Sequence, residues 1–216
     1  MREDLEQQEQ LQILKAFWEA NKTWIISISF IIIVVISSYN GWSFWQKNQK
    51  EKASLLLINV EKNINNQKLD IAVELVKKLS AKHEDSLQRG LGGLMIAKAL
   101  FAEGRKEDAE KEFRSLVTNS NSGISWLAKI RLAGLLLDMN RPGDVLDVIP
   151  EEIPTQWIGL ASDRRGDALY AVGRNEDAKK MWERALIAYN KDGLQLAAAK
   201  IVSRKIATIN SSLLKK

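Results

Sequence analysis

The sequence predicts an all-α protein in which one membrane-spanning helix precedes an array of helical hairpins. Three observations support this fold class. Only three of the 216 residues are proline and twelve are glycine, so few residues interrupt helices. An uncharged and mainly apolar stretch begins near residue 23, and a fixed spacing of small and bulky residues recurs after it.

The uncharged stretch covers residues 23–46. A helix rises about 1.5 Å per residue and needs about 20 apolar residues to cross about 30 Å of hydrocarbon. This stretch therefore predicts a transmembrane helix. Trp24 at one end and Trp42 and Trp45 at the other are expected to anchor the helix at the two membrane interfaces.

The predicted span divides the chain into residues 1–22, the helix 23–46 and a helical domain over residues 47–216. A cleaved signal peptide and a buried helix of a soluble protein are the alternatives for the span. Against the first, the preceding segment contains more acids than bases and no small-residue cleavage site follows. Against the second, the stretch lacks a polar stripe.

Basic residues on the two sides of the span are nearly balanced. Three precede it, and Lys47, Lys50, Lys52 and Lys62 follow it. This count leans slightly toward a cytoplasmic carboxyl end, although long domains are translocated despite their charge. The charge pattern alone does not decide the orientation.

A repeated set of residue offsets follows the span. The clearest copy comprises Gly166, Leu169, Gly173, Ala178, Trp182 and Ala185. The same offsets occur 69 residues earlier, at Ala97, Leu100, Gly104, Ala109, Phe113 and Leu116. Because 69 residues is close to twice the roughly 34 residues of a tetratricopeptide repeat (TPR), the spacing predicts a TPR α-solenoid.

Two weaker copies and a terminal helix complete the predicted array. The middle copy comprises Ala133, Leu136, Asn140, Val145 and Ile149. A degenerate first copy comprises Val60, Gln67, Ala72, Val76 and Leu79, and a C-terminal capping helix is expected over about residues 193–210. Asn140 stands where the clear copies have glycine, which predicts a left-handed backbone at the end of each first helix. An irregular helical bundle is the alternative fold.

Successive first helices of a TPR array line a concave groove that holds a peptide. The offsets place eight candidate protein-binding residues there: Leu94, Lys98, Phe101, Ile130, Leu137, Asp163, Asp167 and Tyr170. Apolar residues in the middle are expected to give affinity, and charged residues at the ends to give register. The alternative is that the capping helix or the membrane-proximal helices cover this lining.

No motif for catalysis, a cofactor or a metal occurs in the sequence. The chain has no cysteine and one histidine, His83, in a polar stretch. Asp163 and Asp167 lie four residues apart and could in principle serve acid–base catalysis, but such pairs on repeat helices are usually solvated or bind partners. No enzyme activity, cofactor or metal is predicted.

The charge is unevenly distributed along the chain. Residues 1–22 contain three bases and five acids, a net charge of −2, so a total of +5 leaves +7 for the remainder. Nucleic acid or anionic lipid could be attracted by this charge. A polar outer face of the capping helix explains it better, and no nucleic-acid partner is expected.

Two stretches carry a resemblance to a known family. One is the end of the span, with Gly41, Trp42, Phe44 and Trp45. The other comprises Trp157, Asp163, Arg165, Gly166, Asp167, Ala168, Leu169, Gly173, Ala178 and Trp182. Both resemble the YfgM-like family, the single-span, TPR-containing ancillary subunits of the bacterial SecYEG translocon. The basic carboxyl end and the weak middle repeat with Pro142 depart from that family.

This resemblance implies an inner-membrane protein with a cytoplasmic amino terminus and a periplasmic repeat domain. It also implies partners, namely the SecYEG translocon and periplasmic chaperones. The leading hypothesis is a scaffold that recruits a chaperone or client through its groove. The alternative is a structural assembly factor of another envelope complex that acts through its span, and homo-oligomerisation stays open.

Overall fold

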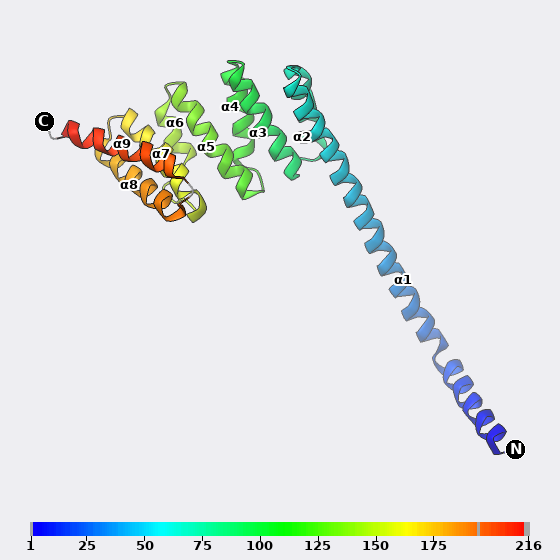
Figure 1. Ribbon diagram of the computed structural model, residues 1–216. Helices are drawn as coiled ribbons and strands as arrows, with labels where there is room; N and C mark the ends of the chain where they lie inside the picture. Colours follow the sequence, from blue (N-terminus) through cyan, green and yellow to red (C-terminus); the bar gives the residue numbers. More distant parts are fainter. Residues whose placement is uncertain (1, 194, 214–216) are drawn as a thin grey trace. The chain divides into compact units, whose positions relative to one another are not determined.

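The computed structural model describes residues 2–193 and 195–213, so residues 194 and 214–216 of the predicted repeat domain lie outside the described part. The regular elements of the described residues are α-helices and one 3-10 helix, which confirms the predicted all-α class (Figure 1). The chain forms two compact units, Met1–Lys52 and Ala53–Lys216. The first helix, α1 (Arg2–Asn65), passes through both.

The predicted span lies within α1. In the described residues, α1 is the one helix that is long and apolar enough to cross a membrane. No part of its most apolar window is buried by the rest of the described chain. A core helix of a soluble protein would be mostly covered, so the exposure of this window argues against that alternative. The exposed surface is apolar, as expected of a helix solvated by lipid.

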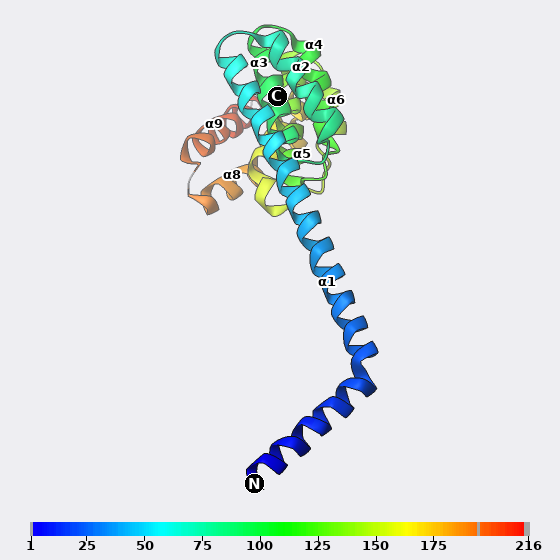
Figure 2. The same cartoon turned by 90° about the vertical axis from the view of Figure 1, so that its right-hand side faces the viewer.

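The second unit consists of consecutive helical hairpins. The last part of α1 pairs with α2 (Leu69–Lys82), and three further hairpins follow: α3 (Leu87–Ala102) with α4 (Lys106–Val117), α5 (Ser122–Asp138) with α6 (Pro142–Val148), and α7 (Ile158–Ala171) with α8 (Asn175–Asp192). The final helix is α9 (Leu196–Leu213), close to the predicted cap. From α2 onward each α-helix contacts the next along the chain, and α5 also contacts both α3 and α7 (Figure 1 and Figure 2).

Each hairpin turns through one residue with positive φ. These residues are Gln67, Gly104, Asn140 and Gly173, with φ of 59°, 77°, 57° and 82°. In every case the next residue donates its backbone N–H to a carbonyl five positions back, as in Arg105 to Leu100 at 2.9 Å and Arg141 to Leu136 at 2.8 Å. This is the Schellman arrangement, which terminates a helix on a left-handed residue. The left-handed turn predicted at Asn140 is confirmed.

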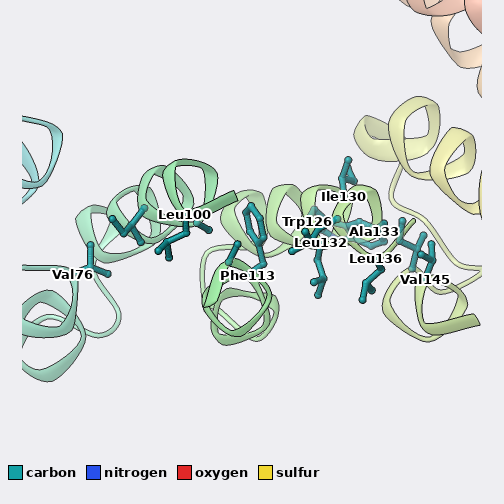
Figure 3. Packing of buried hydrophobic residues seen from close by; sticks show 14 of the residues in the cluster. Val76, Leu100, Phe113, Trp126, Ile130, Leu132, Ala133, Leu136 and Val145 are labelled. Carbon is teal, nitrogen blue, oxygen red and sulfur yellow. The ribbon is translucent and has the colours of Figure 1, made fainter. Parts of the chain in front are cut away.

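The repeated small and bulky residues form the core. All the residues of the four predicted copies except the turn residues are buried. The buried aromatic ring of Phe113 lies between Leu100 of its own hairpin and Trp126 of the next (Figure 3). The small residues allow close helix approach: a Cβ atom added at Gly166 would lie 2.5 Å from the Trp182 ring. Equal offsets in the sequence therefore correspond to equal positions in the core.

The weak middle repeat is a hairpin with a shortened second helix. Pro142 is the first residue of α6, where its missing N–H costs nothing because helix starts leave that donor free. The helix ends at Val148, and the 3-10 helix η1 (Thr155–Trp157) precedes α7. Arg165 of α7 donates hydrogen bonds to the carbonyls of Leu146 and Ile149 at the end of α6. This buried arginine satisfies backbone acceptors that the truncation leaves free.

An arginine–aspartate pair recurs at the start of three second helices. Arg105, Arg141 and Arg174 precede α4, α6 and α8 and bind the aspartate three residues later, as in Arg174 to Asp177 at 2.7 Å. Two of these arginines also reach the preceding hairpin, since Arg105 bonds Asp70 at 2.9 Å and Arg141 bonds Glu110 at 2.7 Å. The turns of adjacent repeats are thereby linked on the surface.

Replacing Gln67 with glycine is expected to stabilise the protein by about 0.5–1 kcal/mol. The left-handed backbone costs a side-chain-bearing residue about 1–2 kcal/mol, and the added flexibility of glycine in the unfolded chain returns part of that gain. The free energy of unfolding of the full chain in detergent micelles, from chemical denaturation followed by circular dichroism, tests this.

Two alanine substitutions control for the change in flexibility. A Cβ atom at either Gly104 or Gly143 meets no atom within 4 Å, so only the backbone conformation differs between them. Gly104→Ala should lower the stability of the protein because φ is +77°, whereas Gly143→Ala, inside α6, should raise it. A loss of stability in Gln67→Gly would contradict the strain argument.

Candidate functional site

A groove lies across α3, α5 and α7, the first helices of three successive hairpins. Its volume is about 680 Å³. The lining residues are Leu91, Leu94, Met95, Lys98, Phe101, Phe113, Leu127, Ile130, Arg131, Gly134, Leu135, Asp138, Leu160 and Arg164. Four of the eight predicted residues are brought together here: Leu94, Lys98, Phe101 and Ile130. The structure thus contains a groove on the predicted face of the repeats.

The groove has a buried floor and a partly exposed rim. Phe113, Ile130 and Leu135 are buried, so they present a fixed apolar surface. Leu91, Phe101 and Leu160 are each 37–38% exposed. Apolar side chains that stay partly uncovered on one concave face are typical of a protein-binding site.

Two rows of equivalent residues, here called ladders, cross the groove. Each ladder contains one residue from each of α3, α5 and α7. The apolar ladder is Leu94, Leu127 and Leu160, and the cationic ladder is Lys98, Arg131 and Arg164. Successive members of both ladders are 33 residues apart in the sequence. The two ladders are offset by four residues, so on each helix the cation lies one turn from the leucine on the same face.

The cationic ladder is incompletely neutralised. Among the described residues, Lys98 and Arg131 have no ion-pair partner, and Arg164 lies 3.6 Å from a carboxylate oxygen of Asp167. Asp138 is the one carboxylate among the described lining residues. Three cations and one anion give the lining a formal charge of +2.

Three of the predicted groove residues lie instead at the capping helix. Asp163 and Asp167 of α7 both bind Nζ of Lys205 from α9, with a distance of 2.7 Å to Asp163 Oδ1. Asp167 also accepts a hydrogen bond of 3.0 Å from the indole of Trp182, whose ring lies 5.6 Å from that of Tyr170. Asp163, Asp167 and Tyr170 are thus not among the residues that line the groove around Leu94. Lys205 covers the two aspartates, whereas Tyr170 stays 48% exposed and lines, with Asp167, a second hollow beside α9.

Leu137 is also outside the groove. It lies in the last turn of α5 and is half-buried against the hydrophobic core. A helix places residue 137 two turns after Ile130 on the same face, but this turn belongs to the end of the hairpin, where core residues cover it. Helix periodicity assigns Leu137 to the face of α5 that carries Ile130, but it cannot show that core residues pack over Leu137.

Asp163 and Asp167 differ in their environment. Burial raises the pKa of Asp163, and the nearby Asp167 carboxylate adds to this, while the hydrogen bond from Lys205 opposes it. The net direction is upward, so the site disfavours the ionised form of Asp163. Asp167 has three donors or cations around it, namely Lys205, Trp182 and Arg164. Asp167 is therefore the principal acceptor that holds the cap.

The three predicted membrane-interface residues lie in α1 and are exposed. Trp24, Trp42 and Trp45 are uncovered by the described chain, and the rings of Trp42 and Trp45 are 5.3 Å apart. Exposed tryptophans at both ends of an apolar helical segment fit the interfacial role that the sequence predicts.

Sequence reasoning missed most of the two ladders. Leu127, Leu160, Arg131 and Arg164 could have been found by extending the 33-residue spacing from Leu94 and Lys98 to positions outside the core. The role of Lys205 had no comparable signal in the sequence. Lys205 lies in the terminal helix, outside the repeats, and its partners are 38 and 42 residues away.

The stacked hairpins with a concave groove and a terminal cap define a TPR-type solenoid, a class of protein-interaction scaffold. The chain belongs to the tetratricopeptide repeat-like domain family, whose model matches residues 15–211. This match confirms the predicted TPR fold.

Curated relatives resemble the chain over most of its length. The ancillary SecYEG translocon subunit of Neisseria gonorrhoeae is 26% identical, with 93% of this chain and 98% of the relative covered. That of Aggregatibacter actinomycetemcomitans is 25% identical, with 84% and 89% covered. Among solved structures, MamA from Desulfovibrio magneticus RS-1 aligns with a TM-score of 0.49 at 15% identity, covering 74% of this chain and 96% of that one. The resemblance to ancillary translocon subunits is thus confirmed.

Neutralising the two cap aspartates should have unequal effects. Asp167→Asn is expected to destabilise the protein by about 1–3 kcal/mol, because charge-assisted hydrogen bonds to Lys205 and Trp182 are weakened. Asp163→Asn should cost nothing or stabilise at neutral pH, because it removes a carboxylate whose charged form is disfavoured by burial. Chemical denaturation of the full chain measures both.

The pH dependence gives the sign of the Asp163 effect. A raised folded-state pKa contributes stability below the ordinary value of 3.8, and this contribution is lost as the pH rises through the folded value. The stability of Asp163→Asn relative to the unchanged protein should therefore increase from about pH 4 to neutral pH. A decrease over that interval would refute this assignment.

Proposed function

We propose that this protein is a membrane-anchored scaffold that binds proteins at the SecYEG translocon and links the translocon to periplasmic chaperones. Residues 23–46 anchor it in the bacterial inner membrane, residues 1–22 lie in the cytoplasm and the repeat domain lies in the periplasm. The observation that carries this proposal is the partly exposed apolar groove across α3, α5 and α7 in a chain whose relatives are named ancillary translocon subunits.

The exposed apolar helix supports the anchor. Its uncovered apolar surface would be costly in water, and roughly 25 cal/mol per Å² of such surface favours transfer to lipid. The helix continues from the apolar segment into the first hairpin without a break, so the repeat domain stays attached at the membrane. The orientation is part of the proposal and needs its own test, since the charges beside the span are nearly balanced.

The groove supports a binding function for unfolded or extended protein segments. Its floor is apolar and fixed, while leucine and aromatic side chains at the rim are accessible. Such surfaces gain free energy by covering apolar area and gain register from charges beside it. A scaffold needs no catalytic residue, and both cap aspartates already bind Lys205.

Protease protection tests the proposed orientation. In intact spheroplasts, externally added protease should digest a carboxyl-terminal tag, because the repeat domain is expected in the periplasm. A cytoplasmic marker that survives in the same sample shows that the membrane is intact. A tag that becomes accessible only after lysis would place the domain in the cytoplasm and overturn the periplasmic role.

Site-specific crosslinking tests the groove. A photoreactive amino acid at Phe101 or Leu160, both partly exposed in the groove, should capture SecYEG subunits or a periplasmic chaperone in native membranes, identified by mass spectrometry. The matched control is Lys78, an exposed residue of α2 outside the groove.

Equal capture from Lys78 and from the groove positions would count against groove binding. Replacing residues 23–46 with an unrelated span separates the two functions considered: groove-dependent capture should persist, whereas an assembly factor that acts through its span should lose its partner.

A further inference from the structure

The two ladders in the groove restrict the chemistry of the segment that it binds. We propose that the groove recognises an acidic, apolar protein segment in an extended conformation, with carboxylates at about every third residue. This inference rests on the proposed function, which concerns protein binding as such, and adds the class of partner.

The charge of the groove lining indicates the sign of the charge on the bound segment. Lys98 and Arg131 are exposed and lack an ion-pair partner in the described chain, and Arg164 has one carboxylate at 3.6 Å. Asp138 alone opposes them within the described lining. A basic segment would meet three like charges, whereas carboxylates would form charge-assisted pairs beside a low-dielectric apolar floor.

The leucine ladder gives the second requirement. Leu94, Leu127 and Leu160 lie one helical turn from Lys98, Arg131 and Arg164 respectively. Each first helix therefore presents the same pair, an apolar side chain and a cation, to a bound segment. A matching segment carries an apolar side chain next to each carboxylate, and the repetition favours a partner with a repeating pattern.

The distance between helices gives the spacing. Because α3 contacts α5 and α5 contacts α7 directly, their axes are about 8–10 Å apart. A polyproline II strand has three residues per turn and rises about 3.1 Å per residue, so side chains three residues apart share a face and are about 9 Å apart. Carboxylates at every third position can thus reach successive cations.

The size of the groove limits how much of a segment it holds. A volume of about 680 Å³ accommodates a few side chains with the backbone that joins them. An extended strand places a few apolar side chains in that volume and keeps its backbone accessible to water or to lining side chains.

Binding of labelled peptides by the full chain in detergent micelles tests the proposal. The probes are twelve-residue peptides with four copies of Glu-Leu-Pro, Gln-Leu-Pro or Lys-Leu-Pro, measured by fluorescence anisotropy. The glutamate peptide should bind most tightly and the lysine peptide most weakly. Added salt should weaken the binding of the glutamate peptide most, because this binding depends on attraction between exposed charges.

Variants of the ladder locate the binding. Arg131→Gln and Lys98→Gln should each weaken binding of the glutamate peptide about two- to fivefold, as expected for the loss of one solvent-exposed charge pair, and should leave binding of the glutamine peptide nearly unchanged. Lys78→Gln, a change of the same charge at an exposed site of α2, should have no effect. Circular dichroism confirms that each variant is folded.

The outcomes separate this proposal from the broader one. Equal binding of the three peptides, or equal losses from Lys78→Gln and Arg131→Gln, would overturn the acidic specificity. A peptide of the same composition with its four glutamates clustered at one end should bind more weakly, and equal binding would overturn the third-residue spacing. Failure of all peptides while crosslinking at Phe101 succeeds would refute this inference and leave the scaffold function intact.

Discussion

The backbone at the turn of each hairpin determines which side chains meet across the repeats. At Gln67, Gly104, Asn140 and Gly173 the chain takes positive φ, and the following N–H bonds to the carbonyl five residues earlier. This ends each first helix at a fixed point and starts the second at a fixed rotation. Residues at equal distances from the turn therefore reach equivalent positions in every hairpin. The core and the two groove ladders both depend on that equivalence.

The fold could be predicted because its determinants are local or strictly periodic. Glycine and asparagine tolerate the left-handed turn, and small residues beside bulky ones satisfy close helix packing, so both leave a pattern in the sequence. The weak middle repeat with Pro142 was recognisable by the same offsets, since a proline in the first position of α6 disturbs no hydrogen bond. The end of α6 has a local signal as well, because Pro150 disfavours helical backbone at Ile149, and Arg165 then binds carbonyls at this helix end.

The site was predicted only in part, for a different physical reason. Leu94, Lys98, Phe101 and Ile130 follow from helix periodicity and meet in one groove. Asp163, Asp167 and Tyr170 have the same periodicity, but Lys205 of α9 binds both aspartates and Trp182 donates a further hydrogen bond to Asp167. Periodicity assigns a residue to a face of a helix, whereas the cover on that face depends on how a distant helix docks. The ion pairs also distinguish two parts of the surface. Asp163 and Asp167 of α7 are paired with Lys205, whereas Lys98 of α3 and Arg131 of α5 have no ion-pair partner among the described residues.

Under the proposed function, the membrane anchor lowers the binding affinity that the groove needs for its partner. A groove of about 680 Å³ contacts only a few residues of a segment, and such contacts typically give weak affinity. A membrane helix that joins the first hairpin without interruption confines the groove to the surface where its partners emerge. Confinement of this kind raises the effective concentration toward the millimolar range, so a dissociation constant of that order suffices for occupancy. Weak contacts also dissociate quickly, which suits a scaffold that passes segments on. Repeated, shallow recognition by leucine and cation pairs is therefore sufficient when the span supplies proximity.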